Sequence, residues 1–419
     1  MPADVSLARS KWTCPCSSAG NWRLCRAPAK IDTDRPPCDR GEGGWEAPSA
    51  SRYRHGGSGA MVVRIDGSVG EGGGQILRTS LALAALLSRE VEIVNIRRGR
   101  KVPGLQPQHL TAVRAIRDIT RGRTLGDELG SELLIFRPGT CDGGVYEFDV
   151  SKIRASAGSV SLIFQTVLPA LLFAPRPTHL ILRGGTHVPF SPPTTYVERV
   201  FLPALRRMGG RASLKTVRWG WYPQGGGIVE ADIEPVERLS AVELTRREEL
   251  VKIEGLAVVS NLPLSIAERF CRRLLQRLAH SELVAEVELL QAPASGKGAG
   301  LFAFAYYGDV VAGFSALGEV GKRAETVADE VHRAFMAHHR SGKVVERHLA
   351  DQLLLYMALA EGRSTMTVSE ITTHLVTNVW VIEQFLPVKF EVDGEVGRPG
   401  VISVEGVGFR PGATSPEGS

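Results

Sequence analysis

The chain of 419 residues has no long apolar run, few aromatic residues and little net charge. No uninterrupted hydrophobic stretch approaches the ~20 residues that span a bilayer, and the N-terminus has no apolar segment typical of a secretory signal. We therefore expect a cytoplasmic protein that makes no membrane contact. With 43% hydrophobic and 23% charged residues, the composition is that of a globular protein with room for two or three domains.

The low net charge limits the nucleic-acid contacts that the chain can make. The formal charge is +5, and nine Lys/Arg against six Asp/Glu in residues 1–60 leave only +2 for the rest. Aromatic residues make up 6%, and the sequence contains no aromatic-rich RNA-binding module or long basic stripe. Any nucleic-acid contact must therefore be local, through clustered arginines.

Residues 1–60 differ in kind from the rest of the chain. They are rich in Pro, Gly, Ser and Arg, show no periodicity, and contain Cys14, Cys16, Cys25 and Cys38. The C-x-C pair and the gaps of eight and twelve residues that follow it do not match the CxxC pairs of strong zinc sites. We expect a disordered extension, or a start codon placed upstream of a true beginning at Met61. Residues 411–419 are expected to form a flexible C-terminal tail.

From residue 61 onward, strands and helices alternate in a recurring order. Strands are expected at 61–66, 91–97 and 131–137, with helices at 74–87 and 107–120, and the rhythm returns in 145–233 and again in 349–385. This pattern predicts an α/β protein of the α+β type in which three units, each a sheet with two helices, form one large domain. Residues 61–245 hold the first two units and 342–410 the third, while the more charged 246–341 reads as a smaller inserted α/β domain. Its GKGAG at 296–300 lacks the flanking residues of a P-loop and predicts a hairpin turn.

A glycine-rich turn joins the first predicted strand and helix in DGSVGEGGGQILR, residues 66–78. Five glycines in nine residues leave backbone N–H groups bare beside a helix N-terminus, which suits an anion. Glu71 is an unusual neighbour for a bare phosphate and suggests an intervening metal ion, while Arg78 could add a fixed positive fork. A tight turn without a ligand is the alternative.

Two further segments hold candidate functional residues. The loop IRRGRKVPGLQPQH at 96–109 follows a strand and could grip a phosphate through Arg97 and Arg100, with Gln108 and His109 at the next helix start completing the pocket. A solvated basic loop is the alternative. In TTHLVTN, His374 should lie at the start of a helix capped by Thr372 or Thr373, so its ring is expected at the loop edge. It is either a nucleophile or a surface residue.

These segments, in this order, resemble the RNA 3′-terminal phosphate cyclase family. The likeness covers most of residues 61–408 and is densest in DGSVGEGGGQILR, IRRGR, PGLQPQHLTAV, FRPGT, FQTVLPALL, YPQGGG, HLADQLLLYMALA and HLVTN. It implies three repeats of a four-stranded sheet with two helices, and a smaller inserted domain. It also implies ATP-dependent conversion of an RNA 3′-phosphate to a 2′,3′-cyclic phosphodiester, with a divalent metal (Mg²⁺ or Mn²⁺), through enzyme-histidyl-AMP and RNA-(3′)pp(5′)A.

The resemblance also implies a role for each matching residue. His374 matches the nucleophile that accepts AMP, and Glu71 matches the metal-binding glutamate. The residues that handle the substrate phosphate match Arg78, Arg97, Arg100, Gln108 and His109, of which Arg97, Arg100 and His109 also count as catalytic. The nucleotide pocket matches Gln165, Pro192, His348, Asp351, Gln352, Gly72 and Gly73.

The sequence departs from the better-known bacterial pattern at one position of this pocket. His348 stands where those members have a tyrosine, three residues before Asp351; either ring can stack on adenine, so the nucleotide preference stays open. Two other functions are considered: a cyclase-like protein of ribosome biogenesis that binds RNA without catalysis, and an enzyme like the enolpyruvyl transferases. The combination of His374 and Glu71 argues against the former, and the latter would have no need of His374.

Overall fold

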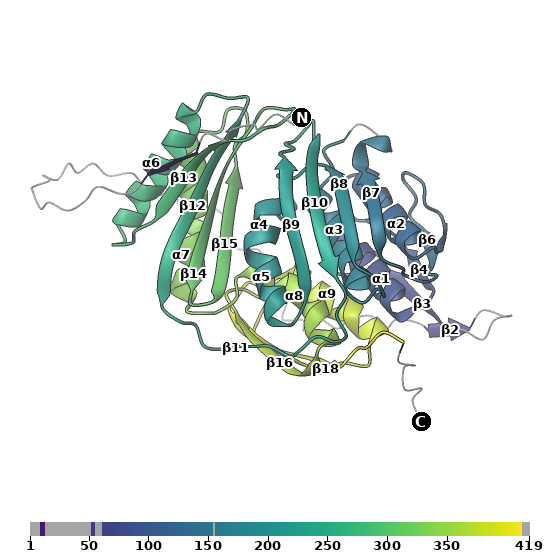
Figure 1. Cartoon of the computed structure of the whole chain (residues 1–419). Coiled ribbons are helices and arrows are strands. Elements are labelled where there is room, and N and C mark those ends of the chain that lie inside the picture. Colours follow the sequence, from purple (N-terminus) through teal and green to yellow (C-terminus); the bar gives the residue numbers. More distant parts are fainter. Residues whose placement is uncertain (1–8, 13–51, 55–60, 154–155, 413–419) are drawn as a thin grey trace, which may run out of the picture.

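The computed structural model describes residues 9–12, 52–54, 61–153 and 156–412. Three units in it share one topology, in which strand, helix, strand, helix and two further strands follow in the chain (Figure 1). In each sheet the strands lie in the order first, second, fourth, third, with the first pair parallel and the others antiparallel. The α/β class and the threefold repetition are thereby confirmed.

The first two units follow one another directly in the chain. The first consists of β3 (Met61–Asp66), α1 (Gly74–Leu87), β4 (Val91–Val94), α2 (Pro107–Ile119), β5 (Arg123–Leu125) and β6 (Leu134–Arg137). The second consists of β7 (Gly144–Asp149), α3 (Val160–Leu172), β8 (Thr178–Gly184), α4 (Thr194–Tyr196), a π-helical turn (Val197–Phe201), α5 (Leu202–Arg207), β9 (Arg211–Arg218) and β10 (Gly227–Glu234). Strand β4 is shorter than the expected 91–97, because Asn95 and Arg97 adopt positive φ angles of 53° and 55° and turn the chain.

The third unit is interrupted by another sheet. It consists of β11 (Glu243–Leu244), α8 (Arg347–Leu359), β16 (Glu361–Val368), α9 (Thr373–Phe385), β17 (Phe390–Asp393) and β18 (Gly400–Val407). Because β11 pairs with β16, the unit begins before the insertion, and its first strand lies inside the 61–245 segment that we assigned to the first two units. A strand of two residues shows no alternation by which sequence could reveal it.

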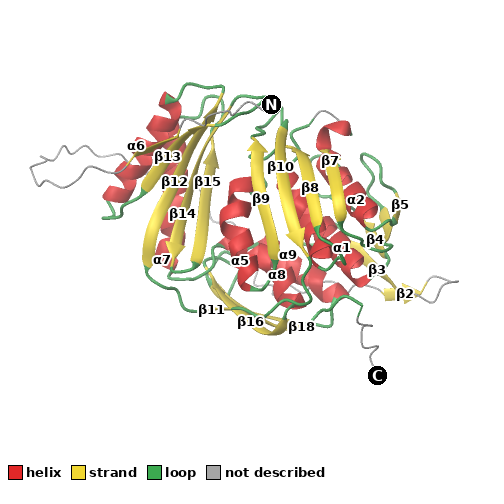
Figure 2. Ribbon diagram, viewed as in Figure 1, coloured by secondary structure: helices red, strands yellow, loops and turns green. Residues whose placement is uncertain are grey.

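The interrupting segment has its own sheet and hydrophobic core. It contains β12 (Leu250–Ser260), α6 (Ser265–Ala279), β13 (Glu286–Gln291), β14 (Gly298–Tyr307), β15 (Val310–Leu317) and α7 (Ala324–Ser341). Helices α6 and α7 cover one face of the sheet (Figure 2). The expected hairpin at 296–300 is wrong, because β12 lies between β13 and β14, so that loop crosses over a strand. The domain boundaries at 246 and 341 stay a prediction.

Two short segments of the expected disordered extension form strands. Strand β1 (Arg9–Trp12) pairs with β13, and β2 (Arg52–Arg54) pairs with β3. For these seven residues the expectation of disorder is wrong, because a sheet edge offers unpaired backbone groups to any extended segment, whatever its side chains. The four cysteines considered for zinc, and residues 413–419 of the expected tail, lie outside the described residues.

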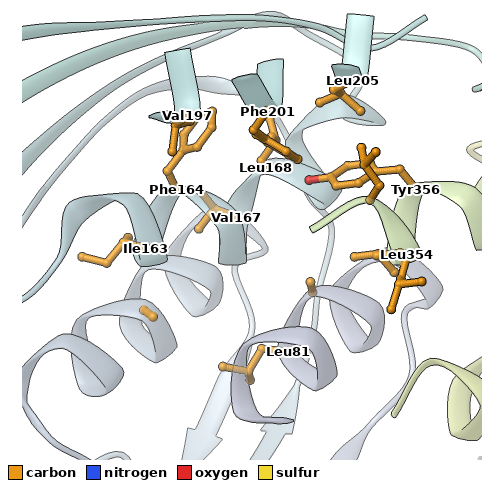
Figure 3. Close-up of a cluster of buried hydrophobic side chains, with 14 of the residues drawn as sticks. Leu81, Ile163, Phe164, Val167, Leu168, Val197, Phe201, Leu205, Leu354 and Tyr356 are labelled. Carbon is orange, nitrogen blue, oxygen red and sulfur yellow. The ribbon is translucent and has the colours of Figure 1, made fainter. Parts of the chain in front are cut away.

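Helices from all three units pack together to form the main core. Leu81 of α1, Phe164 and Leu168 of α3, Phe201 of the π-helical turn and Leu354 of α8 are buried in one cluster (Figure 3). In α3 every residue is buried except Gln165, which marks the side of the helix that faces the site described below. In the described ranges, no helix is both long enough and apolar enough to cross a membrane.

Candidate functional site

A cleft of about 530 Å³ lies between the repeated units and the inserted sheet. Helices α1, α3, α8 and α9 and the loop before α4 contribute to its walls, while β15 and α7 contribute Phe314 and His338 from the other side. Seven residues expected in the site line this cleft: Arg78, Gln165, Pro192, His348, Asp351, Gln352 and His374. The other seven, Glu71, Gly72, Gly73, Arg97, Arg100, Gln108 and His109, are outside its lining.

His374 links the two groups of residues. It is the second residue of α9, whose cap Thr372 accepts a hydrogen bond from the Leu375 N–H at 3.0 Å. Its Nε2 lies 2.8 Å from Glu71 Oε2, whereas its Nδ1 is buried and has no hydrogen-bond partner among the described residues. Because the side chain is 42% exposed, Nε2 is the ring nitrogen that a substrate can reach.

The glycine-rich turn brings Glu71 to this histidine. Gly70 and Gly72 have φ angles of +59° and +55°, which only glycine adopts readily. A Cβ atom on Gly70 would lie 2.1 Å from Thr377 Oγ1 of α9, and one on Gly74 would lie 2.6 Å from His109 Nε2. The bare backbone is therefore needed for close packing as well as for the turn. Helix α1 begins without a side-chain cap, so its first N–H groups remain available to an anion.

Arg78 and Asp351 are two half-buried charged groups of the cleft. Arg78 donates to Gln75 Oε1 at 2.9 Å, and burial lowers its pKa to about 10, against the attraction of Asp351, so it stays a cation. Burial raises the pKa of Asp351, and its Oδ1 has no hydrogen-bond partner among the described residues. A buried unpaired acceptor of this kind is costly unless a ligand completes it.

The two arginines of the basic loop differ in their contacts. Arg97 donates through Nη1 to the carbonyl oxygens of Val102 and Gly104, at 2.8 and 2.9 Å, and so holds its own loop in shape. Arg100 lies 3.5 Å from Glu71 Oε2, and a Cβ on Gly73 would lie 2.9 Å from its Nη2. Of the pair expected to grip a phosphate, Arg100 is the one that contacts the glycine turn.

Gln108 and His109 lie at the start of α2. The Gln108 side chain accepts the Ser159 N–H at 3.1 Å and so ties the first unit to the start of α3. His109 Nδ1 accepts the Gln106 N–H at 3.2 Å, which places the ring proton on Nε2, the atom next to Gly74. Burial, with the nearby arginines, lowers the pKa of His109 to about 3, so His109 offers a neutral N–H donor beside the turn.

This burial predicts a pH effect on stability. The folded state keeps His109 neutral down to a pH near 3, whereas an unfolded histidine takes up a proton below about 6.5. The free energy of unfolding therefore falls as the pH is lowered through that window. The His109→Gln side chain can still accept the Gln106 N–H. Between pH 7 and 5, the free energy of unfolding measured in urea should fall by about 2 kcal/mol less in this variant than in wild type. Equal losses in the two proteins would contradict a buried neutral His109.

Three polar residues form a hydrogen-bonded row along the cleft. Gln165 donates to Gln352 Oε1 at 2.7 Å, and Gln352 donates to the His348 carbonyl oxygen at 2.9 Å. The His348 Nε2 accepts from Arg347 Nε at 3.3 Å. Sequence reasoning missed Arg347, which lines the same cleft and stands directly before the HLADQ motif. It also missed Phe190, although the loop GGTHVPFSPP suggests a rigid wall.

A divalent metal fits this site only with help from a ligand. Among the described residues no three His, Cys, Asp or Glu side chains stand together as a metal cage. Glu71 offers a carboxylate at the turn, with Arg100 and His374 as neighbours. Mg²⁺ is commonly bound in this manner, by one or two carboxylates together with substrate phosphates and water.

Comparisons with known proteins show what this chain is similar to. The family model described as RNA 3′-terminal phosphate cyclase matches residues 69–392. Proteins of that name from Pyrobaculum aerophilum and Nostoc punctiforme are 47% and 45% identical, over 84% and 77% of this chain and 100% and 94% of theirs. One from Pyrococcus abyssi is 39% identical, over 82% of this chain and 98% of its own.

A solved structure of EPSP synthase from Acinetobacter baumannii aligns with 85% of this chain and 67% of its own, at 9% identity and a TM-score of 0.21. That score is too low to support any conclusion. The family model and the relatives, by contrast, cover most of the chain, and it belongs to the RNA 3′-terminal phosphate cyclase family.

Proposed function

We propose that this protein uses ATP to convert an RNA 3′-terminal phosphate into a 2′,3′-cyclic phosphodiester, in the cytoplasm, releasing pyrophosphate and AMP. The observation that supports this best is the position of His374. Its Nε2 lies at the cleft, 2.8 Å from the Glu71 carboxylate, while its Nδ1 is buried. An imidazole nitrogen held between a nucleotide-sized cleft and an anion-binding turn is suited to attack on a phosphorus atom.

In the first step, His374 Nε2 attacks the α-phosphorus of ATP and pyrophosphate leaves. Attack needs a lone pair on Nε2, so the hydrogen bond to Glu71 must be given up and the ring proton held on Nδ1. The N–H groups at the start of α1 and the half-buried Arg78 favour the negative charge that develops on the phosphate oxygens. A divalent metal held by Glu71 and the phosphates would offset part of that charge.

In the later steps, AMP passes to the RNA and the ring closes. An oxygen of the RNA 3′-phosphate attacks the phosphorus of histidyl-AMP, which breaks the P–N bond and forms RNA-(3′)pp(5′)A. Arg100 and the Nε2–H of His109 would hold that RNA phosphate; their position beside the glycine turn supports this role. The vicinal 2′-OH then attacks the 3′-phosphorus within the same ribose, and AMP leaves.

Labelling with α-labelled ATP tests this function. The wild-type protein with Mg²⁺ or Mn²⁺ should retain acid-labile AMP on a denaturing gel, and an RNA with a 3′-phosphate should discharge it and gain a cyclic end. A non-catalytic RNA-binding relative would retain no label. An enolpyruvyl transferase would retain none either, and would act on a small anionic metabolite in place of ATP. Absence of both the adduct and the cyclic end would refute the proposal.

The division between the two phosphate sites gives a second prediction. Arg97 and Arg100 lie outside the lining of the cleft that holds His374, so they should serve the RNA end more than ATP. In an Arg97→Ala/Arg100→Ala protein, the rate of AMP transfer to RNA, or of ring closure, should fall by a larger factor than the rate of self-adenylation. Each lost charge-assisted contact is worth roughly 1.5–3 kcal/mol. Single-turnover kinetics that follow the two steps separately measure the difference.

The single variants serve as controls. Arg100→Ala alone should carry most of the kinetic effect, because Arg97 is engaged with its own loop. Arg97→Ala should additionally loosen the loop, as increased hydrogen exchange of residues 96–105 would show. If adenylation collapses while a pre-adenylated double variant cyclises RNA normally, these arginines belong to the ATP site.

A further inference from the structure

Phe190 combines two unfavourable features at the edge of the cleft. Its side chain is fully exposed, at 104% of the reference area, and its backbone has a φ angle of +60°. A left-handed backbone is strained for a bulky residue, and an exposed aromatic ring forgoes the stabilisation that burial would give. Strained positions cluster at functional sites, where the surrounding structure holds them in place.

The loop around Phe190 is fixed at several points. The Pro192 carbonyl oxygen accepts from Ser161 Oγ of α3 at 2.6 Å, and Ser191 Oγ donates to the Val188 carbonyl oxygen at 3.1 Å. Pro189 and Pro192 restrict the backbone on either side. The ring is therefore presented on a preorganised loop, and little entropy would be lost if a ligand packed against it.

The neighbours of the ring indicate which ligand that is. Phe190 lines the same cleft as Gln165, Pro192 and His374. Arg100 and His109, which we assign to the RNA phosphate, lie outside that lining. The ring therefore belongs with the groups around the nucleotide. An aromatic face also binds any base by stacking, and His348 offers a smaller ring there than tyrosine would.

We propose that Phe190 stacks on the base of the nucleotide co-substrate and contributes to its affinity. This inference rests on the proposed use of ATP. It assigns to this chain an aromatic surface for the base in the loop before α4, in addition to His348. Because the contact is made to the base alone, a sugar triphosphate without a base should not make it.

The test measures equilibrium binding by calorimetry, which does not require the protein to become adenylated. Asn tolerates a positive φ, so Phe190→Asn should keep the loop shape while removing the ring. Its Kd for ATP should rise about tenfold, the size expected for one lost stack between a base and an aromatic ring. Phe190→Tyr should bind ATP as wild type does. Ribose 5′-triphosphate, which has no base, should bind equally to wild type and to Phe190→Asn.

A matched control is Tyr222→Asn, which removes another exposed aromatic ring (68%) from a loop outside the cleft lining and should leave the Kd for ATP unchanged. Equal losses of affinity for ATP and for ribose 5′-triphosphate would overturn the proposal and assign Phe190 to loop shape. A loss confined to RNA binding would also overturn it and place the ring on the RNA path. If wild type binds ATP without forming an adduct, the proposed function fails while this test still stands.

Discussion

A His374→Ala protein should retain no AMP when it is incubated with α-labelled ATP and metal, and it should form no cyclic RNA ends. We expect adduct formation to fall by at least about 1000-fold, because a residue that forms the covalent bond itself has no substitute. The other cleft imidazoles cannot replace it. His348 Nε2 is engaged by Arg347, and both ring nitrogens of His338 are buried. The measurement is retention of label on a denaturing gel, followed over time.

The fold should survive this change. The His374 side chain is 42% exposed, and the cap of α9 is made by Thr372, so the melting temperature should change little. His280→Ala, which removes an exposed histidine after α6, is the matched control and should adenylate normally. If the His374→Ala protein still becomes adenylated, another residue is the nucleophile.

The sequence was sufficient for features that are local. Five glycines before an apolar helix predicted the turn, and a Thr cap before His374 predicted that the ring would lie at a helix start. The resemblance to the family then predicted that distant segments form one site. In the structure, His374 lies against Glu71 although about 300 residues separate them. Periodicity alone could not have paired them, since neither residue belongs to an alternating pattern.

Features that depend on contacts between units could not be predicted. Arg97 and Arg100 appear equivalent in IRRGR, yet the positive φ at Arg97 turns its guanidinium to carbonyl groups of its own loop, while Arg100 contacts the turn. Strand β11 was missed because two residues carry no pattern. The inserted segment supplies Phe314 of β15 and His338 of α7 to the cleft, and β15 packs against the π-helical turn; no local motif predicts this contact.

Glu71→Gln should lower the rate of adenylation by more than about 100-fold. Replacing even a residue that only hydrogen-bonds to a metal ligand typically costs 10–100-fold in metal affinity or activity. The glutamine has the same shape and can still accept a hydrogen bond from His374 Nε2, but it lacks the charge that holds a cation. If Glu71 binds metal, the rate should stay low and rise only in part at high Mg²⁺ or Mn²⁺. If Glu71 only orients the ring, the variant should adenylate at close to the wild-type rate.

Metal titrations of single-turnover adenylation separate these two roles. Glu90→Gln provides the control, because Glu90 is a carboxylate of the same unit, paired with Arg137 at 2.8 Å, and should leave both rate and metal dependence unchanged. Arg100 and His374 both face Glu71, at 3.5 and 2.8 Å, so the protein itself balances the carboxylate with positive or donor groups. A cation that draws the carboxylate away would also free Nε2 of His374. A normal rate with ordinary metal dependence in Glu71→Gln would therefore remove the carboxylate from the metal-binding role and leave the anion-binding turn and Arg78 as the groups that stabilise the reacting phosphate.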